Sequence, residues 1–304
     1  MRKLRVLIIL CAISLIGMFA GTAVAAEGHL TPPPGKVRVA TTCVKLRLGA
    51  KSTNLAEMLD LIDKTAMCCN PDIIVLSESI FTRMNREGVS TTNDTGNSEE
   101  LEGPCFEALK RKAVERGCYI AFNLNAPHEN ETPKKFYNSN FLISPEGVII
   151  GRYDKNKVPD AEIKAGLSTG EGRPVFELAV RGMKVKTGMA ICYDLADKAY
   201  AEGEERVVKT LVDNGANLIL VSTIGDFTAE AISAAKDNGV YIVVSGQDKY
   251  IDNSLGASAI IDPKGNTLVQ FTDKTGFQNQ PYEDMLYRKG EDGSFGYADI
   301  KIVE

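Results

Sequence analysis

Short apolar segments alternate with segments of helical periodicity along most of the chain. The segment 72–76 runs through isoleucine, valine and leucine without a polar break after its first residue. Such a run is typical of a strand buried on both faces. Before it, apolar residues three and four positions apart predict a helix that begins at Ser52 or Thr53. A strand that needs cover on both faces requires a layered fold.

The predicted elements follow the same order, β-α-β-α-β-β-β, in both halves of the chain. The predicted strands are 37–42, 72–76, 118–124, 136–143, 148–153, 175–180, 185–191, 217–222, 240–245, 257–261 and 267–271. The later helices are predicted at 104–116, 199–214 and 228–237, and long polar loops at 83–101 and 125–135. This order predicts an α/β domain with mixed sheets rather than a simple doubly wound one.

The first 26 residues have the parts of a secretory signal peptide, with a basic start, an apolar run from Val6 to about Ala20 and small residues after it. The run is shorter than the roughly 20 residues that span a bilayer, and Cys11 lies inside it rather than in a lipobox. We therefore expect no stable membrane anchor after cleavage. The predicted parts are a signal peptide at 1–26, a tether at 27–36 and one domain at 37–304, in an exported protein that is periplasmic or secreted.

The charge and the cysteine content limit the partners and the disulfides that the chain can have. The net charge is −5 and no basic stripe is present, so nucleic acid is not a predicted partner. Export permits disulfides, but the sequence alone does not assign pairs. If one cysteine stays reduced for chemistry, the other five of the exported chain cannot all pair with one another. The cysteines left after signal removal are Cys43, Cys68, Cys69, Cys105, Cys118 and Cys192.

Histidine is scarce, which excludes several kinds of active site. The chain has only His29, in the predicted tether, and His128, in a polar loop. Two histidines are too few for most sites that depend on this residue. These sites are a cysteine–histidine pair, a serine–histidine–aspartate triad and a histidine-rich zinc site. If the chain is an enzyme with a nucleophile, its base is a carboxylate or a lysine, and we predict no metal and no organic cofactor.

Three reactive side chains occur at or just beyond the ends of predicted strands. Alone, Cys192 is better explained as a structural cysteine, Glu78 as an exposed acid and Lys155 as a surface lysine. Together they are the groups that an acyl-transfer site without histidine needs: a nucleophile, a base and a positive charge for the oxyanion. In α/β folds, ligand sites lie at the carboxyl ends of strands.

Four segments make the chain resemble the nitrilase, or carbon–nitrogen hydrolase, superfamily. The segment 76–78, Leu-Ser-Glu, is similar to the family's strand-end glutamate, and 151–155 is similar to its lysine segment. The segment 188–194, Gly-Met-Ala-Ile-Cys-Tyr-Asp, resembles its nucleophile segment closely. Glu162, which lies 14 residues before Phe176, matches a second family glutamate. The resemblance spans about 37–270.

The resemblance implies a four-layer α-β-β-α sandwich and a Glu78–Lys155–Cys192 triad. It implies hydrolysis of a small-molecule amide or N-carbamoyl compound, at a bond other than a peptide bond, through a thioester on Cys192. Glu162 is then expected to orient Lys155 or the substrate, and the backbone N–H of Tyr193 to bind the oxyanion with Lys155. The resemblance also implies a homodimer or larger homo-oligomer.

Departures from the family pattern leave the substrate open. Ser77 replaces the usual proline, Lys157 stands where histidine is frequent, and Leu-Ala-Asp-Lys at 195–198 replaces Arg-Phe-Pro-Glu. Acyl transfer and nitrile hydrolysis remain alternatives on the same site, and a non-catalytic binding protein on the same scaffold is an alternative of another class. Glycosylation of Asn93 and Asn130 is left open as well.

Overall fold

The computed structural model describes residues 31–44, 51–79, 81, 98–247, 258–272, 276–278 and 293–302. The predicted signal peptide, the first part of the tether and most of the loop at 83–101 lie outside the described residues, as does Asn93. No described helix is both long enough and apolar enough to cross a membrane.

The first sheet is built around three parallel strands. β1 pairs with β2 and β2 with β3, while β4 and β5 continue the sheet in antiparallel order. β14 pairs antiparallel with the whole of β1, and the short β6 pairs with the start of β4. The bounds are β1 (Val37–Val44), β2 (Ile73–Val75), β3 (Tyr119–Pro127), β4 (Phe136–Ile143), β5 (Ile149–Asp154), β6 (Leu167–Ser168) and β14 (Gly293–Ile300).

The second sheet repeats this plan. β8, β9 and β10 are parallel, β7 is antiparallel to β8, and β11, β12 and β13 extend the sheet beyond β10 in antiparallel order. The two sheets join where the end of β1 pairs with the end of β10. The bounds are β7 (Val175–Val180), β8 (Met183–Ile191), β9 (Leu218–Ser222), β10 (Tyr241–Gln247), β11 (Ala259–Ile261), β12 (Thr267–Thr272) and β13 (Gly276–Gln278).

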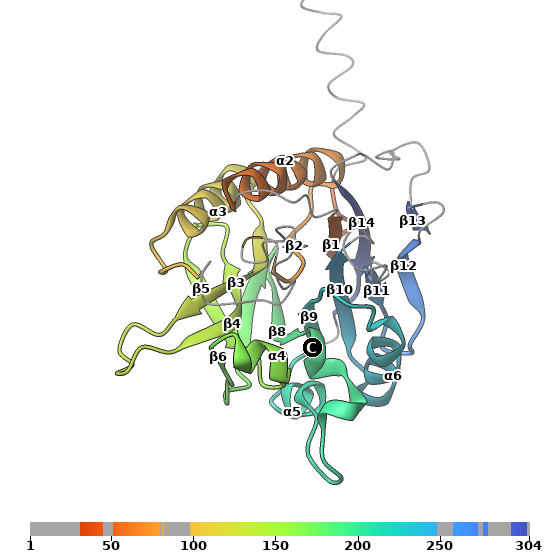
Figure 1. The fold of residues 1–304 in the computed structure, drawn as a ribbon. Coiled ribbons are helices and arrows are strands. Elements are labelled where there is room, and N and C mark those ends of the chain that lie inside the picture. The colour runs from red at the N-terminus through yellow and green to blue at the C-terminus, as the bar shows by residue number, and fades with distance from the viewer. Residues whose placement is uncertain are drawn as a thin grey trace, which may run out of the picture.

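Helices cover the outer faces of both sheets (Figure 1). α2 (Lys51–Cys69) and α3 (Pro104–Arg116) pack side by side on the first sheet, and α5 (Val207–Asp213) and α6 (Thr228–Asn238) pack on the second. The predicted four-layer α-β-β-α sandwich is confirmed, as is the order β-α-β-α-β-β-β in both halves. A short helix, α4 (Asp160–Lys164), and two 3₁₀ turns, Cys192–Leu195 and Asp197–Ala199, complete the described helical segments.

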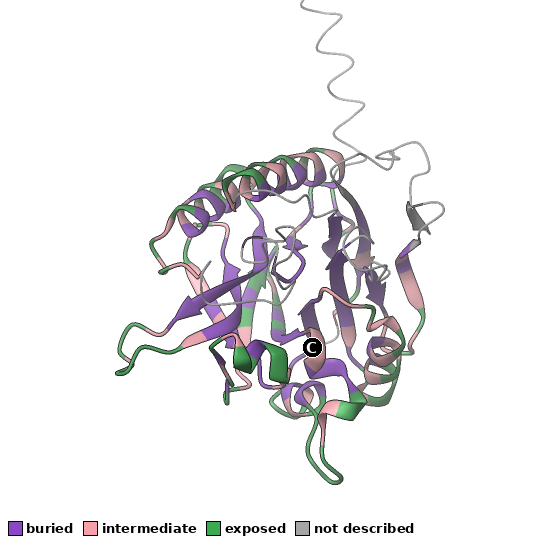
Figure 2. Ribbon diagram, in the orientation of Figure 1, coloured by how far each residue is buried: buried purple, intermediate pink, exposed green. Residues whose placement is uncertain are grey.

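Both faces of the central strands are covered, which explains the apolar runs. In β2, Ile73 and Val75 pack into the core between the two sheets. Ile74 between them, and Leu76 after the strand, pack instead under α2 and α3. Figure 2 shows the strands buried and the exposed residues gathered on the outer helices and loops.

The predicted helix at 199–214 is wrong over its first half. α5 begins only at Val207. The hydroxyl of Tyr200 donates to the carbonyl of Asp194 (2.6 Å) and accepts from the N–H of Val207 (3.2 Å), which fixes the preceding segment as an irregular loop. Gly203 in that loop has a φ of +78°, outside the helical region.

Pairing between distant strands accounts for the other differences. β3 continues to Pro127, three residues past its predicted end, because it pairs with β4 as far as Phe136. The predicted loop at 125–135 is therefore shorter. The sequence analysis also missed α4 and β6, which are very short, and β13 and β14 near the C-terminal end.

Replacement of Phe106 by alanine should destabilise the fold. The ring of Phe106 is fully buried and meets Phe122 edge-on at 5.4 Å and Phe141 at 4.8 Å between centroids. The cavity left by Phe106→Ala should cost about 3–5 kcal/mol of unfolding free energy, measured by urea denaturation. Met67→Ala on exposed α2 surface should change it by less than about 0.5 kcal/mol. Equal midpoints for the two variants would contradict this packing.

Candidate active site

Three of the four predicted catalytic side chains lie at or just beyond the carboxyl ends of strands. Glu78 is three residues past the end of β2, Lys155 follows β5 directly, and Cys192 follows β8 directly. The fourth, Glu162, lies on α4. The structure brings all four together near the end of the sheets where β1 and β10 join.

Lys155 lies between the two glutamates. Its Nζ donates to Oε1 of Glu78 at 2.9 Å and to Oε1 of Glu162 at 2.8 Å. The side chains of Lys155 and Glu78 are fully buried, and that of Glu162 is nearly so. Burial alone lowers the pKa of Lys155, but the nearby Glu78, Cys192 and Glu162 together hold it well above its ordinary value. Lys155 is therefore a fixed positive charge.

Two neutral donors complete the coordination of the carboxylates. Nδ2 of Asn138, on β4, donates to Oε1 of Glu78 (2.8 Å) and to Oε2 of Glu162 (3.2 Å). The N–H of Ile224 donates to Oε2 of Glu78 at 3.1 Å. Burial raises the pKa of Glu162, while Lys155 and Asn138 oppose this rise.

Asn138 was not predicted as a site residue, although an asparagine within a predicted strand is itself informative. It occupies a fully buried position in a predicted strand, where an amide without partners is costly. A buried amide in such a strand therefore indicates a polar network inside the fold.

Cys192 occupies a sharp turn between β8 and the 3₁₀ segment that follows it. Its φ is +45°, a conformation uncommon for residues other than glycine, and it begins the 3₁₀ turn. Burial, together with Glu78, raises the pKa of the thiol to about 12, against Lys155 and hydrogen bonds from Thr223 and Ile224. The resting thiol is therefore protonated at neutral pH.

Asp194 joins the loop that carries Lys155 to the turn that carries Cys192. Four donors from these two segments converge on its carboxylate. They are the backbone N–H groups of Asn156 (3.1 Å), Lys157 (2.7 Å) and Ile191 (2.9 Å) and the hydroxyl of Tyr153 (2.7 Å). Burial raises the pKa of Asp194 to about 6, although these donors lower it.

Tyr193 lies in the first turn of the 3₁₀ segment, where backbone N–H groups have no partner within the helix. Its side chain is partly exposed, and Nζ of Lys198 lies 5.7 Å from the ring centroid. Lys157, which replaces the frequent family histidine, forms an ion pair with Glu204, and its Nζ lies 4.5 Å from the ring centroid of Tyr200. The side chain of Lys157 is thus bound outside the Glu–Lys–Glu group.

His128 takes no part in the cluster. Its Nε2 lies 2.6 Å from Oδ2 of Asp154, and its ring packs edge-on against Tyr137. Among the described residues, no group of three or more histidine, cysteine or acidic side chains is placed to hold a metal ion.

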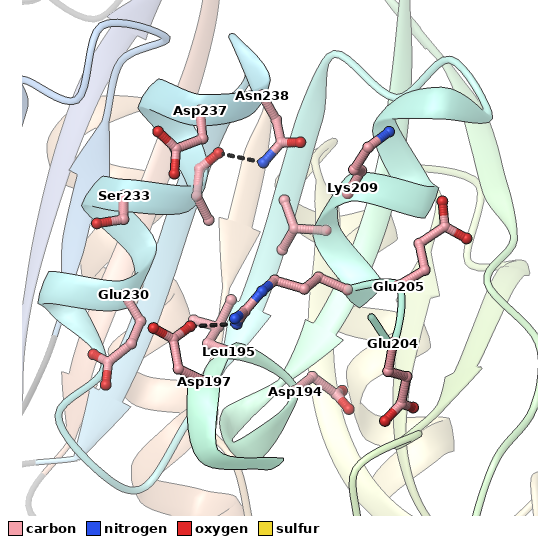
Figure 3. Close-up of a pocket in the computed structure, with 13 residues that line it drawn as sticks. Asp194, Leu195, Asp197, Glu204, Glu205, Lys209, Glu230, Ser233, Asp237 and Asn238 are labelled. Carbon is pink, nitrogen blue, oxygen red and sulfur yellow. Dashed lines mark hydrogen bonds and ion pairs between the residues drawn. The ribbon is translucent and has the colours of Figure 1, made fainter. Parts of the chain in front are cut away.

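A pocket of about 550 Å³ lies between α5 and α6, beside the 3₁₀ turn (Figure 3). Most of its lining is charged, and Asp197 pairs with Arg206 there. Asp194 lines this pocket, whereas none of the four predicted catalytic residues does. The pocket is therefore separate from the cluster that carries the reactive groups.

A family model for carbon-nitrogen hydrolases matches residues 37–277. The chain belongs to the carbon-nitrogen hydrolase family. It is 27% identical over 244 residues to the probable hydrolase nit2 of Schizosaccharomyces pombe. That alignment covers 74% of this chain and 83% of the relative. It is 26% identical over 233 residues to an (R)-stereoselective amidase of Pseudomonas sp., in an alignment that covers 74% of this chain and 77% of the amidase.

Solved structures share the fold of this hydrolase. A double mutant of the amidase from Nesterenkonia sp. AN1, in complex with acrylamide, matches with a TM-score of 0.64 and 17% identity, over 89% of this chain and 93% of that one. A single mutant of the same amidase is described as a member of the nitrilase superfamily. Together with the named relatives, this identifies the chain as an amidase-like hydrolase of that superfamily, as its sequence predicts.

Replacement of Asp194 by asparagine should weaken the link between the two loops. The amide keeps the size of the side chain but replaces one acceptor oxygen with a donor, so at least one pair of buried donors loses its acceptor. We expect a loss of about 2–5 kcal/mol of unfolding free energy, together with a lower kcat, measured by denaturation and amide hydrolysis.

Asp197→Asn provides the matched control, because Asp197 lies three residues further on and its side chain is 79% exposed. This variant should stay within about 0.5 kcal/mol of the parent. Equal stability of the two variants would show that Asp194 does not hold the loops together.

Proposed function

We propose that this hydrolase cleaves the amide or N-carbamoyl bond of a small molecule through a thioester on Cys192. The observation that carries the proposal is the buried lysine held between two carboxylates beside a cysteine at a strained turn. Relatives named amidases and hydrolases support water as the acceptor.

In the first step Cys192 attacks the substrate carbonyl. Because the pKa of its thiol is about 12, the proton must leave as the carbon–sulfur bond forms. Glu78, whose charge acts on this thiol, is the proposed acceptor. The carbonyl oxygen becomes an oxyanion, which Lys155 and the N–H of Tyr193 stabilise. Glu78 then returns the proton to the departing nitrogen, and ammonia or an amine leaves.

In the second step Glu78 takes a proton from water, which attacks the thioester. The carbon–sulfur bond breaks, the acid is released, and the sulfur of Cys192 regains a proton. Glu78 thus serves as base and acid in turn, and no step draws on a metal or an organic cofactor.

Glu162 orients Lys155 in this proposal. An ammonium group has three N–H donors, and two of those of Lys155 are used by Glu78 and Glu162. Within the described part of the chain no third acceptor bonds this group, so its third N–H is available for the substrate oxygen in this proposal. With two directions fixed, the third donor cannot turn away, so the charge is preorganised before the oxyanion forms.

Acyl transfer and nitrile hydrolysis would use the same nucleophile. The probable hydrolase and the (R)-stereoselective amidase described above support neither alternative. A non-catalytic role on this scaffold gains no support from them either. Export through residues 1–26 and assembly into a homodimer or larger oligomer stay predictions from the sequence.

Cys192→Ser should abolish hydrolysis without unfolding the protein. The hydroxyl keeps the size of the thiol but is a far weaker nucleophile, so we expect at least a ~10³-fold loss of kcat. Ammonia release from a panel of amides and N-carbamoyl compounds measures this. Cys68→Ser, a partly exposed cysteine on α2, is the control and should keep full activity. Equal activity in both variants would end the assignment of Cys192.

The reactivity of Cys192 should increase with pH far beyond neutrality. The thiolate is the reacting species, and burial places the pKa of this thiol at about 12. Alkylation of Cys192 by N-ethylmaleimide, followed by peptide mass spectrometry, should therefore accelerate from pH 7 to pH 10 without a plateau. A plateau near pH 7 would mean a preformed thiolate and would remove the need for Glu78 as base.

A further inference from the structure

Three buried asparagines connect the carboxylates to the strand that carries the nucleophile. Asn123 lies on β3, and Asn138 and Asn140 lie on β4. None of them is more than 1% exposed. Nδ2 of Asn123 donates to Oδ1 of Asn138 at 2.7 Å and to Oδ1 of Asn140 at 3.0 Å. We call these three residues the asparagine network.

The network has a direction that its ends determine. At one end the N–H of Ser79, which can only donate, bonds Oδ1 of Asn123 at 2.9 Å. Asn123 must therefore direct its NH₂ group toward Asn138 and Asn140. At the other end Nδ2 of Asn140 donates to the carbonyl of Ala190 at 3.1 Å, and a carbonyl can only accept. Each amide has one orientation that satisfies all its neighbours.

The orientation of Asn138 matters for the proposed chemistry. Its Oδ1 faces Asn123, so its NH₂ group faces Glu78 and Glu162. The reversed amide would place a carbonyl oxygen against both carboxylates and remove two hydrogen bonds. Because Glu78 and Glu162 repel each other, the loss of a donor shared between them would disturb the position of Lys155 as well.

From these contacts we propose that Asn123 is a positioning residue, which acts through the amide of Asn138 to keep two donor hydrogens on Glu78 and Glu162. The described hydrogen bonds of Asn123 go to Ser79, Asn138 and Asn140, not to either carboxylate or to Lys155. The proposal rests on the proposed function of Glu78 as the acid–base group. A purely structural role, in which Asn123 only satisfies buried polar groups, is the competing explanation.

Two substitutions at Asn123 separate these roles. Asn123→Asp has nearly the same shape and keeps the acceptor for Ser79. When the introduced carboxyl is protonated, its hydroxyl can still donate to Oδ1 of Asn138. When it is ionised it can only accept, so Oδ1 of Asn138 faces the introduced carboxylate if the amide stays, and faces Glu78 and Glu162 if the amide reverses. Asn123→Leu loses every hydrogen bond at this position and no longer holds Oδ1 of Asn138, but it places no acceptor opposite that oxygen.

Measurement of kcat against pH tests the proposal. For Asn123→Asp we expect an added alkaline limb, with kcat falling about 10- to 100-fold as the introduced carboxyl ionises. For Asn123→Leu we expect the parent profile, lowered uniformly by less than about 10-fold. A structural role predicts the reverse order, with the leucine variant worse at all pH values. An Asn123→Asp profile of parental shape would overturn the proposal.

A second pair keeps the test decisive if Asn123→Asp fails to fold. Asn138→Leu and Asn140→Leu each remove one equally buried member of the network, but only Asn138 contacts the carboxylates. We expect Asn138→Leu to lose at least about 10-fold more kcat than Asn140→Leu, and its acidic limb to move to higher pH because donors favour ionised carboxylates. Equal losses with unchanged profiles would overturn the proposal.

Failure here stays distinguishable from failure of the proposed function. The activity of Cys192→Ser tests the proposed hydrolase reaction, and this substitution changes no residue of the asparagine network. If that variant is inactive and the asparagine variants show no pH effect, only the role of Asn123 is refuted. Circular dichroism melts of each variant confirm that the compared proteins are folded.

Discussion

The buried ion group of Lys155 with Glu78 and Glu162 is the interaction on which the site depends. An ammonium without partners cannot be buried, because the loss of hydration is too costly. Two carboxylates around one ammonium leave one surplus negative charge, which the amide of Asn138 and the N–H of Ile224 help to offset. The asparagine network and the hydrogen bonds of Asp194 thus have the same effect: they hold the buried ion group of Lys155, Glu78 and Glu162 in one geometry.

The two-sheet architecture supplies that dry core and a polar region at one end of it. Apolar side chains fill the space between the sheets along most of the strands. Near the end where β1 pairs with β10, hydroxyl and amide side chains replace them; Thr42 and Ser245, for example, are buried there and bond each other at 3.0 Å. The change from apolar to polar lining occurs where Glu78 and Cys192 leave their strands. The fold therefore provides water exclusion and polar support at the same point.

The sequence predicted the parts of the fold and site that depend on local pattern. Apolar runs located the central strands. Glu78, Lys155 and Cys192 were recognised because each lies at or just beyond the end of a predicted strand, in a segment that resembles the family's. Glu162 was located only through family resemblance, since α4 is five residues long. Asn123 and Asn138 were missed because their partners lie on other elements far along the chain. The helix expected at 199–214 was wrong because side-chain bonding overrides the local pattern: the hydroxyl of Tyr200 bonds Asp194 and Val207, and α5 begins only at Val207.

The high pKa of Cys192 has a consequence for the lifetime of the protein. Oxidation to sulfenic acid and exchange with disulfides both begin from the thiolate. With its pKa raised to about 12, the thiol of Cys192 stays protonated at neutral pH. If the chain is exported, as its first 26 residues predict, the nucleophile enters an oxidising compartment in its least oxidisable form. Because the thiol needs a neighbouring base to become reactive, it is also protected from oxidation while no substrate is bound.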